Sequence, residues 1–259
     1  MSAPTTWRKP PFIKSDLMRW GLYGAVALYL VITIATLPID WERTSQGITR
    51  AGRIFSGAFP PSFERSGLLI DGFLESLKIA ILATTLGLFL SVPLAFMSAR
   101  NIASKPVYLV GRGIFILARS FHPVIVAIIF VKAVGFGPLA GALTLTVYSI
   151  GFVAKLLAER IEEIDFGQVE AMRSVGAPFF STMVYAILPQ IMPRLVGLGI
   201  YQLDSNLRAS AVVGIVGAGG IGATLANAFG RYDYDFALAI TMVIVGAILI
   251  SEAISGMIR

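Results

Sequence analysis

A few ionisable side chains lie inside otherwise apolar stretches, and they are the residues that could do chemistry. Arg119, followed by Ser120 and His122, lies near the middle of an apolar segment, 107–134. A charge at membrane depth is costly unless water or a partner surrounds it, so it indicates a functional path or an ion pair. A fixed cation there is typical of an anion path. The alternative is a structural pair of Arg119 with a carboxylate such as Asp204.

Two further polar residues, Asn206 and Arg208, follow the apolar segment 186–203. They are predicted to line the outer part of the same path. The alternative is a helix C-terminus whose last carbonyls are satisfied by the arginine. His122 stands before Pro123, which is more typical of a helix irregularity than of a proton relay.

A glycine-rich stretch follows these residues. Its GAGGIG run formally matches the dinucleotide-binding pattern, but no strand precedes it and no acidic residue follows at about 20 positions. Close backbone packing near a pore is the better interpretation. Segment 205–235 is too rich in glycine for a normal span, and irregular backbone at membrane depth must be buried or line a cavity. We therefore predict an outer gate hairpin over 205–235, with gate residues Gly214, Gly217, Gly219, Gly220 and Gly222.

The composition sets the elements that must position these residues. Of 259 residues, 56% are hydrophobic and 14% are charged, which predicts a polytopic membrane protein. There is no cysteine and one histidine, so thiol chemistry and thiolate or imidazole metal sites are excluded, and no cofactor is expected in this chain. The net charge of +6 is spread along the sequence, which argues against a nucleic-acid partner.

Six apolar segments approach the length of about 20 residues that crosses a bilayer as a helix. Basic residues number eleven against six between the two sides, which predicts that both termini are cytoplasmic. The first segment lacks a small-residue cleavage site, so we expect it to be a retained anchor. The predicted spans are 20–37, 68–97, 107–134, 139–157, 186–203 and 236–258.

A polar insert, 165–189, interrupts the apolar sequence on the predicted cytoplasmic side. It has the pattern of two short helices joined by a sharp corner. Asp165 and Gln168 form an acidic version of the capping box, Gly176 suits a left-handed helix end, and Pro178 suits the first position of the next helix. We expect a partner to dock here; the alternative is an ordinary surface loop.

This insert resembles the EAA loop of ABC importer permeases, whose pattern is EAA, three residues, G, nine residues, I, one residue, LP. Met172 and Ala186 replace the second alanine and the isoleucine. The resemblance implies a coupling helix that docks on an ATP-hydrolysing subunit, which would bind ATP and Mg²⁺, since the chain has no GxxxxGK[ST] phosphate loop. The coupling residues implied are Glu170, Ala171, Gly176, Leu188 and Pro189.

Four further runs, IEEID, AVGFGPLAG, VVGIVGAGGIG and YDYDFA, look like the phosphonate-type permeases of that family. The resemblance implies a non-enzymatic permease for a phosphorus oxyanion: a phosphonate, phosphite, hypophosphite or phosphate. The sequence departs from the family around Arg119. Many members have arginine, serine, an apolar residue, proline and an acid there, whereas this chain has His122 and Pro123 in the last two positions and no acid. The implied partners are an ATPase dimer, an extracytoplasmic binding protein, a second permease copy and the lipid of the bacterial plasma membrane.

The expected fold is all-α, the type I ABC importer permease fold with six transmembrane helices and a cytoplasmic coupling helix. The predicted parts are a cytoplasmic tail at 1–19, a first transmembrane helix and outer interfacial segment at 20–66, and a core permease domain at 67–259. An ion-coupled secondary carrier is the alternative, which would use intramembrane carboxylates, and Asp204 is its one candidate. A membrane enzyme is less favoured, since no acid–base pair or activated nucleophile stands out.

Overall fold

The computed structural model describes residues 15–38 and 40–258, and within those ranges the chain contains helices and connecting turns but no strand. It divides into two units, Met1–Ile54 and Phe55–Arg259. Most of the predicted N-terminal tail, residues 1–14, lies outside the described residues. The all-helical prediction is confirmed for the described part of the chain.

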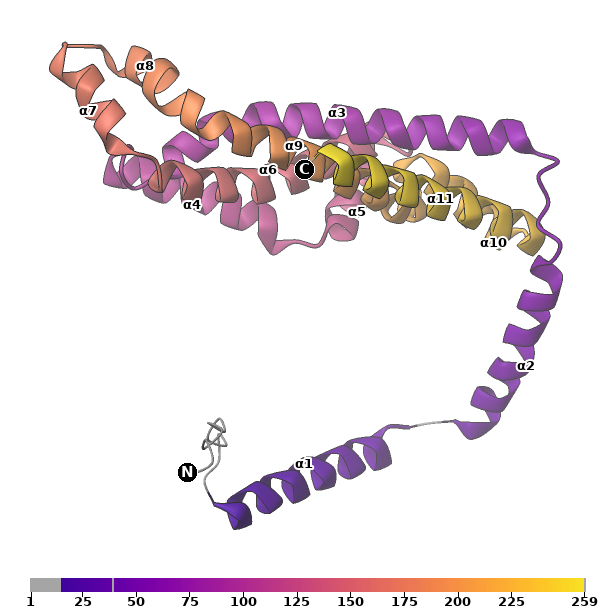
Figure 1. Cartoon of the computed structure of the whole chain (residues 1–259). Coiled ribbons are helices and arrows are strands. Elements are labelled where there is room, and N and C mark those ends of the chain that lie inside the picture. The colour runs from indigo at the N-terminus through magenta and orange to yellow at the C-terminus, as the bar shows by residue number, and fades with distance from the viewer. Residues whose placement is uncertain (1–14, 39, 259) are drawn as a thin grey trace, which may run out of the picture. The chain divides into compact units, whose positions relative to one another are not determined.

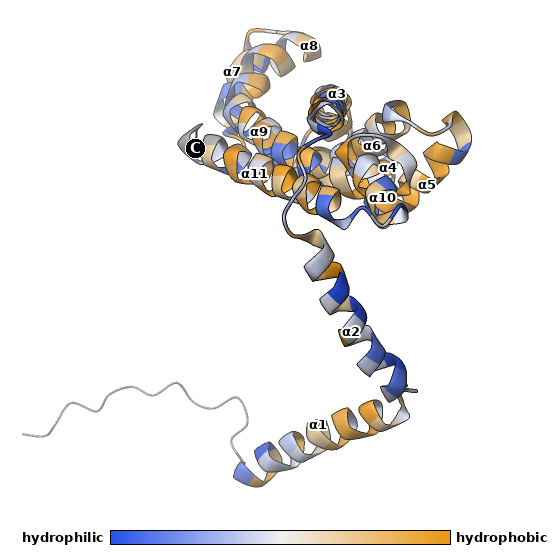
Figure 2. Ribbon diagram, turned by 90° about the vertical axis from the view of Figure 1, so that its right-hand side faces the viewer, coloured by the Kyte–Doolittle hydropathy of each residue, from blue (hydrophilic) through white to orange (hydrophobic). Residues whose placement is uncertain are grey.

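The first unit holds α1 (Asp16–Thr36) and most of α2 (Trp41–Ala58). Helix α1 is long and apolar enough to cross a membrane. In Figure 2, α1 is mainly hydrophobic, whereas α2 alternates hydrophilic and hydrophobic residues along its length. The interfacial position expected for this segment stays a prediction.

The second unit is a bundle built around the pair α3 and α6 (Figure 1). Small residues let these two helices approach closely: a Cβ on Gly87 of α3 would lie 2.4 Å from the Cβ of Ser149 on α6. Over the described residues of both units, five helices, α1 among them, are long and apolar enough to cross a membrane, or six spans if one bent pair counts as a span. The main helices of this unit are α3 (Ser66–Ser98), α4 (Lys105–Ser120), α5 (Pro123–Val134), α6 (Pro138–Glu162), α9 (Leu188–Val213), α10 (Ile221–Gly230) and α11 (Tyr234–Ile258).

The apolar segment predicted as one span, 107–134, is not a continuous helix, because α4 and α5 meet at 91°; together they are still long and apolar enough to form a broken span or a re-entrant loop. Pro123 disfavours helical backbone at the residue before it, and both Phe121 and His122 are extended. The His122 ring then accepts a hydrogen bond from the Val124 N–H at 3.4 Å through Nδ1, capping α5. His122 therefore marks a helix break, as its position before proline indicated.

The predicted hairpin over 205–235 begins later than expected. Helix α9 continues to Val213, and the non-helical backbone is confined to a short turn centred on Gly217–Gly220. The sequence predicts a helix end at residue 203 because segment 205–235 is rich in glycine, yet the first residues of this segment are polar, Asn206 among them. Those polar residues are accommodated inside the bundle, so the helix continues through them.

A buried polar network joins α3, α6 and α9 and explains this extension. Asn206 is fully buried, and its Nδ2 donates to Thr84 Oγ1 and to Ser149 Oγ, each at 2.9 Å. Gln202, also fully buried, donates to Ser149 at 3.1 Å and to Asn206 Oδ1 at 3.0 Å. These hydrogen bonds between side chains of three helices fix the register of the helices that carry them.

The close contact of α3 and α6 predicts a selective response to substitution at Gly87. Replacing Gly87 by valine forces its side chain into Ser149 and should destabilise the bundle by about 1–3 kcal/mol, the usual effect of overpacking. Gly246→Val is the matched control, because nothing lies within 4 Å of a Cβ at this position in α11. Thermal denaturation in detergent should show a lower midpoint for the first variant only; equal midpoints would contradict the contact.

Candidate functional site

The polar insert folds as α7 (Phe166–Ser174) and α8 (Phe179–Thr182), which lie at one end of the bundle, opposite α10 (Figure 1). Asp165 is the N-cap of α7, and its Oδ1 accepts from the Gly167 N–H at 2.9 Å. The reciprocal bond predicted for Gln168 comes instead from Gln190, whose Oε1 accepts from the Asp165 N–H at 2.9 Å. The start of α7 is therefore capped by Asp165 and also tied to α9 through Gln190.

The corner after α7 has the predicted geometry. Gly176 has a φ of +73°, the left-handed conformation that favours glycine. Its N–H donates to the Arg173 carbonyl, and the Ala177 N–H donates to the Met172 carbonyl, both at 3.0 Å, which together make a Schellman motif. Pro178 precedes α8 as its N-cap rather than occupying its first turn.

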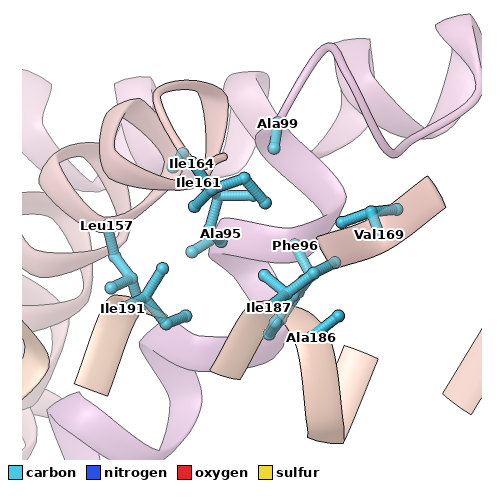
Figure 3. Close-up of a cluster of buried hydrophobic side chains, with 11 residues drawn as sticks. Ala95, Phe96, Ala99, Leu157, Ile161, Ile164, Val169, Ala186, Ile187 and Ile191 are labelled. Atoms are coloured by element: carbon cyan, nitrogen blue, oxygen red, sulfur yellow. The ribbon is translucent and has the colours of Figure 1, made fainter. Parts of the chain in front are cut away.

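The inner face of α7 is fixed to the bundle by an apolar cluster. Val169 is 2% exposed and packs among side chains from α3, α6 and the start of α9 (Figure 3). Both departures from the EAA pattern fall on this cluster: the larger Met172 packs against it, and the smaller Ala186 is buried in it. The buried members are Ala95, Phe96, Ala99, Leu157, Ala158, Ile161, Ile164, Val169, Ala186, Ile187 and Ile191.

The Leu-Pro pair lies where α9 begins, directly after a π-helical turn, Met183–Ile187. The Leu188 N–H bonds to the Met183 carbonyl, five residues back. Pro189 has no N–H to donate, so the regular α-helical ladder cannot run through this position. The motif thus produces a widened turn between α8 and the membrane-length part of α9.

The outer face of α7 and its corner is exposed and suited to docking. Glu170 and Ala171 are exposed on α7. Val175, which is 78% exposed, and Phe180, which is 69% exposed, add apolar surface at the same end of the bundle. Apolar side chains gathered beside a charged group in this way are typical of a protein-binding surface.

The opposite end carries the glycine turn predicted as the outer gate. Gly217, Gly219 and Gly220 have φ values of +94°, +81° and +75°. The Gly217 carbonyl accepts from the Gly137 N–H at 3.1 Å, and the Ile221 N–H donates to Ser76 Oγ at 2.9 Å.

Gly214 and Gly222 close the base of this turn. A Cβ on Gly222 would lie 1.9 Å from the Ala211 carbonyl oxygen, and one on Gly214 would lie 2.5 Å from the Gly219 carbonyl oxygen. A cavity of about 570 Å³ lies at the turn, and Glu75 and Phe136 are among the residues that line it. The five predicted gate glycines therefore lie together.

The residues predicted to form a path are not all brought together. Arg119 and Ser120 are exposed at the end of α4 and line a cavity of about 430 Å³. Asp204 bonds to Arg208 and to Ser251, so the pairing of Arg119 with Asp204 is wrong. Asn206 is fully buried and Arg208 is paired, and neither lines the cavity beside Arg119.

Sequence reasoning missed three residues that the structure places at these sites. Arg112 and Lys155 share the cavity with Arg119, and Gln190 bonds to the start of α7. The seven-residue spacing of Arg112 and Arg119 was an available signal, because such residues share one helix face. The roles of Lys155 and Gln190 depend on contacts between distant segments.

Comparison with known proteins identifies the family. Residues 91–258 match the model of the binding-protein-dependent transport system inner membrane component. The chain belongs to this family. The permease is therefore a multi-pass membrane component of a transport system, and ATP is bound by a partner ATPase.

The permease is similar in sequence to known transport proteins over most of its length. It is 38% identical over 95% of its length to the phosphate-import permease protein PhnE of Mycolicibacterium smegmatis, but it spans only 47% of that protein. It is 35% identical to the phosphite transport system permease protein PtxC of Stutzerimonas stutzeri, covering 93% of this chain and 89% of the relative.

Solved structures share the fold. A permease chain of the MetNI methionine ABC transporter, in an inward-facing conformation, is 23% identical with a TM-score of 0.66, covering 76% of this chain and 97% of that one. A chain of a bacterial ABC transporter for alginate import is 19% identical with a TM-score of 0.54, covering 94% and 98%. The predicted ABC importer permease fold is confirmed.

The left-handed corner predicts how Gly176 responds to substitution. Gly176→Val should destabilise the corner by about 1–2 kcal/mol, because a β-branched side chain is strained at positive φ. Gly176→Asn should be tolerated, since asparagine adopts this conformation readily. Co-purification with the ATPase should be weakened in the valine variant and retained in the asparagine variant. Equal retention by both would show that the corner does not shape the docking surface.

Proposed function

We propose that this permease is the membrane subunit of an ATP-driven ABC importer for a phosphorus oxyanion, such as phosphate, phosphite or a phosphonate. The similarity to PhnE and PtxC over more than nine-tenths of the chain carries the substrate class. The anchored helix α7, with Glu170 on its exposed face, supports the coupling role. An ATPase subunit would hold this face.

The path would lie on the surface that carries Arg119 and Ser120. Both are exposed on the single permease chain, although α4 belongs to the bent pair long and apolar enough to enter a membrane. An exposed arginine at such a depth requires water or a neighbouring subunit rather than lipid. We therefore place a second copy of the permease against this surface, with an aqueous path between the two.

Orientation follows from the charges of the connecting segments. With both termini in the cytoplasm, α7 faces the ATPase and the glycine turn faces the extracytoplasmic side, where a binding protein would deliver the anion. Closure of the ATPase dimer would move α7 and the helices fixed to it as a rigid body. Arg119 would attract the anion only modestly, because the anion must also leave.

The path residues are revised by this arrangement. Arg119 and Ser120 remain in the proposed path. Asn206 instead fixes the register of three helices, and Arg208 neutralises Asp204. That pairing also weakens the ion-coupled carrier as an alternative, because the carboxylate it requires already has an arginine and a serine as partners.

Charge reversal at Glu170 tests the coupling role. Glu170→Arg should lower substrate-stimulated ATP hydrolysis by roughly tenfold or more, since a reversed charge would be buried against the ATPase. Glu42→Arg, on the first turn of α2, is the control and should leave hydrolysis unchanged. Both are measured in the reconstituted complex with its binding protein. Full stimulation in the Glu170 variant would rule out docking through this residue.

Removal of the Arg119 charge tests the path. Arg119→Ala should lower the initial rate of phosphite or phosphate uptake roughly threefold to tenfold, the effect of losing one modest anion contact. Lys132→Ala, in the last turn of α5 and outside the Arg119 cavity, should leave the rate unchanged. Uptake that is unaltered in the Arg119 variant would remove this arginine from the mechanism.

A further inference from the structure

Two basic residues besides Arg119 line its cavity, and they extend from α4 to the facing helix α6. We infer that Arg112, Arg119 and Lys155 form an inner binding station for the transported anion, between the helix break and the coupling end. The inference rests on the proposed function for the nature of the anion. The cavity, of about 430 Å³, is lined by Arg112, Phe115, Ile116, Arg119, Ser120, Lys155 and Glu159.

The three cations lie at successive depths. Arg119 crosses α6 at Gly151, where an added Cβ would lie 2.7 Å from the arginine Cγ. Lys155 follows Gly151 by four residues on α6, about 6 Å further along the helix. Helices α4 and α6 run antiparallel, because Arg119 lies against Gly151 and Arg112 bonds to Glu162. Arg112, seven residues before Arg119 on α4, is therefore about 10 Å further in the same direction. An anion leaving Arg119 towards the coupling end therefore meets Lys155 and then Arg112.

Carboxylates balance two of these cations but leave the cavity positive. Lys155 Nζ lies 3.5 Å from Glu159, one turn on, and Arg112 lies 3.4 Å from Glu162. Arg119 has no carboxylate within ion-pair distance among the described residues. Glu159 in the lining and Glu162 beside Arg112 thus face three cations, which leaves one net positive charge, at Arg119.

Arg112 is the most rigidly held of the three. Its guanidinium lies over the Tyr108 ring at 4.8 Å and contacts Glu162, which also accepts from the Arg100 N–H at 2.9 Å. Its Nε–H is buried and lacks an acceptor within the described part of the chain. The Arg112 side chain is nevertheless 34% exposed, and a guanidinium held in this way is suited to a tetrahedral oxyanion.

Lys155 is the exchangeable member. Its side chain is 41% exposed, and its only ion pair in the described residues is with Glu159. An arriving oxyanion can take the ammonium from Glu159, and the carboxylate can take it back when the anion moves on. Competition of this kind keeps the station weak enough for release, which transport requires.

The absence of cysteine from the natural chain allows a direct test. In the reconstituted transporter, Lys155→Cys should lower phosphite uptake roughly threefold to tenfold. Attaching an aminoethyl group through a methanethiosulfonate reagent returns an ammonium to this position and should restore uptake. A sulfonatoethyl group of similar size should not, and saturating phosphite should slow both modifications. The wild-type complex treated with the same reagents gives the background.

Lys105→Cys is the matched control, because Lys105 is an exposed lysine at the first position of α4 and does not line the cavity. Neither reagent should change phosphite uptake by this variant. Lys155→Gln, which should assemble because the side chain is largely outside the core, should match the unmodified cysteine variant. Equal uptake by all Lys155 variants, or equal effects of the two reagents, would overturn the station. A wild-type complex that imports no phosphorus oxyanion would instead overturn the proposed function.

Discussion

The apolar cluster that fixes α7 to the bundle is the contact on which the rest of the structure depends. A nine-residue helix has little stability alone, and α7 holds its place because Val169 is buried among residues of α3, α6 and α9. The Gln190 side chain adds directional bonds to Asp165 at the same junction. A force applied to the exposed face of α7 therefore reaches membrane-length helices directly.

The same helices reach the opposite end of the bundle. Helix α3 supplies Phe96 to the cluster and Ser76 to the glycine turn, and α9 runs from the π-helical turn to the residues that pack against Gly222. Between the two ends, the buried network of Asn206 and Ser149 holds α3, α6 and α9 in register. Movement at the α7 end can thus be passed to the glycine turn through rigid elements rather than through loops.

Much of this arrangement could be predicted from local sequence. Asp165 and Gly176 predicted the helix α7 and its left-handed corner, and hydropathy predicted most of the membrane-length helices. The break at His122 had a local signal in Pro123, but a continuous apolar run concealed it. The burial of Asn206 could not be predicted, because its partners Thr84 and Ser149 come from segments far away in the sequence.

The number of anions imported for each ATP hydrolysed tests most directly whether the burial of Val169 makes α7 move with the bundle. Val169→Ala removes apolar contacts from the cluster and leaves the exposed docking face unchanged. In the reconstituted transporter, this variant should still bind and stimulate the ATPase but import fewer anions for each ATP hydrolysed. An unchanged ratio, together with faster amide hydrogen exchange in α7, would contradict the claim.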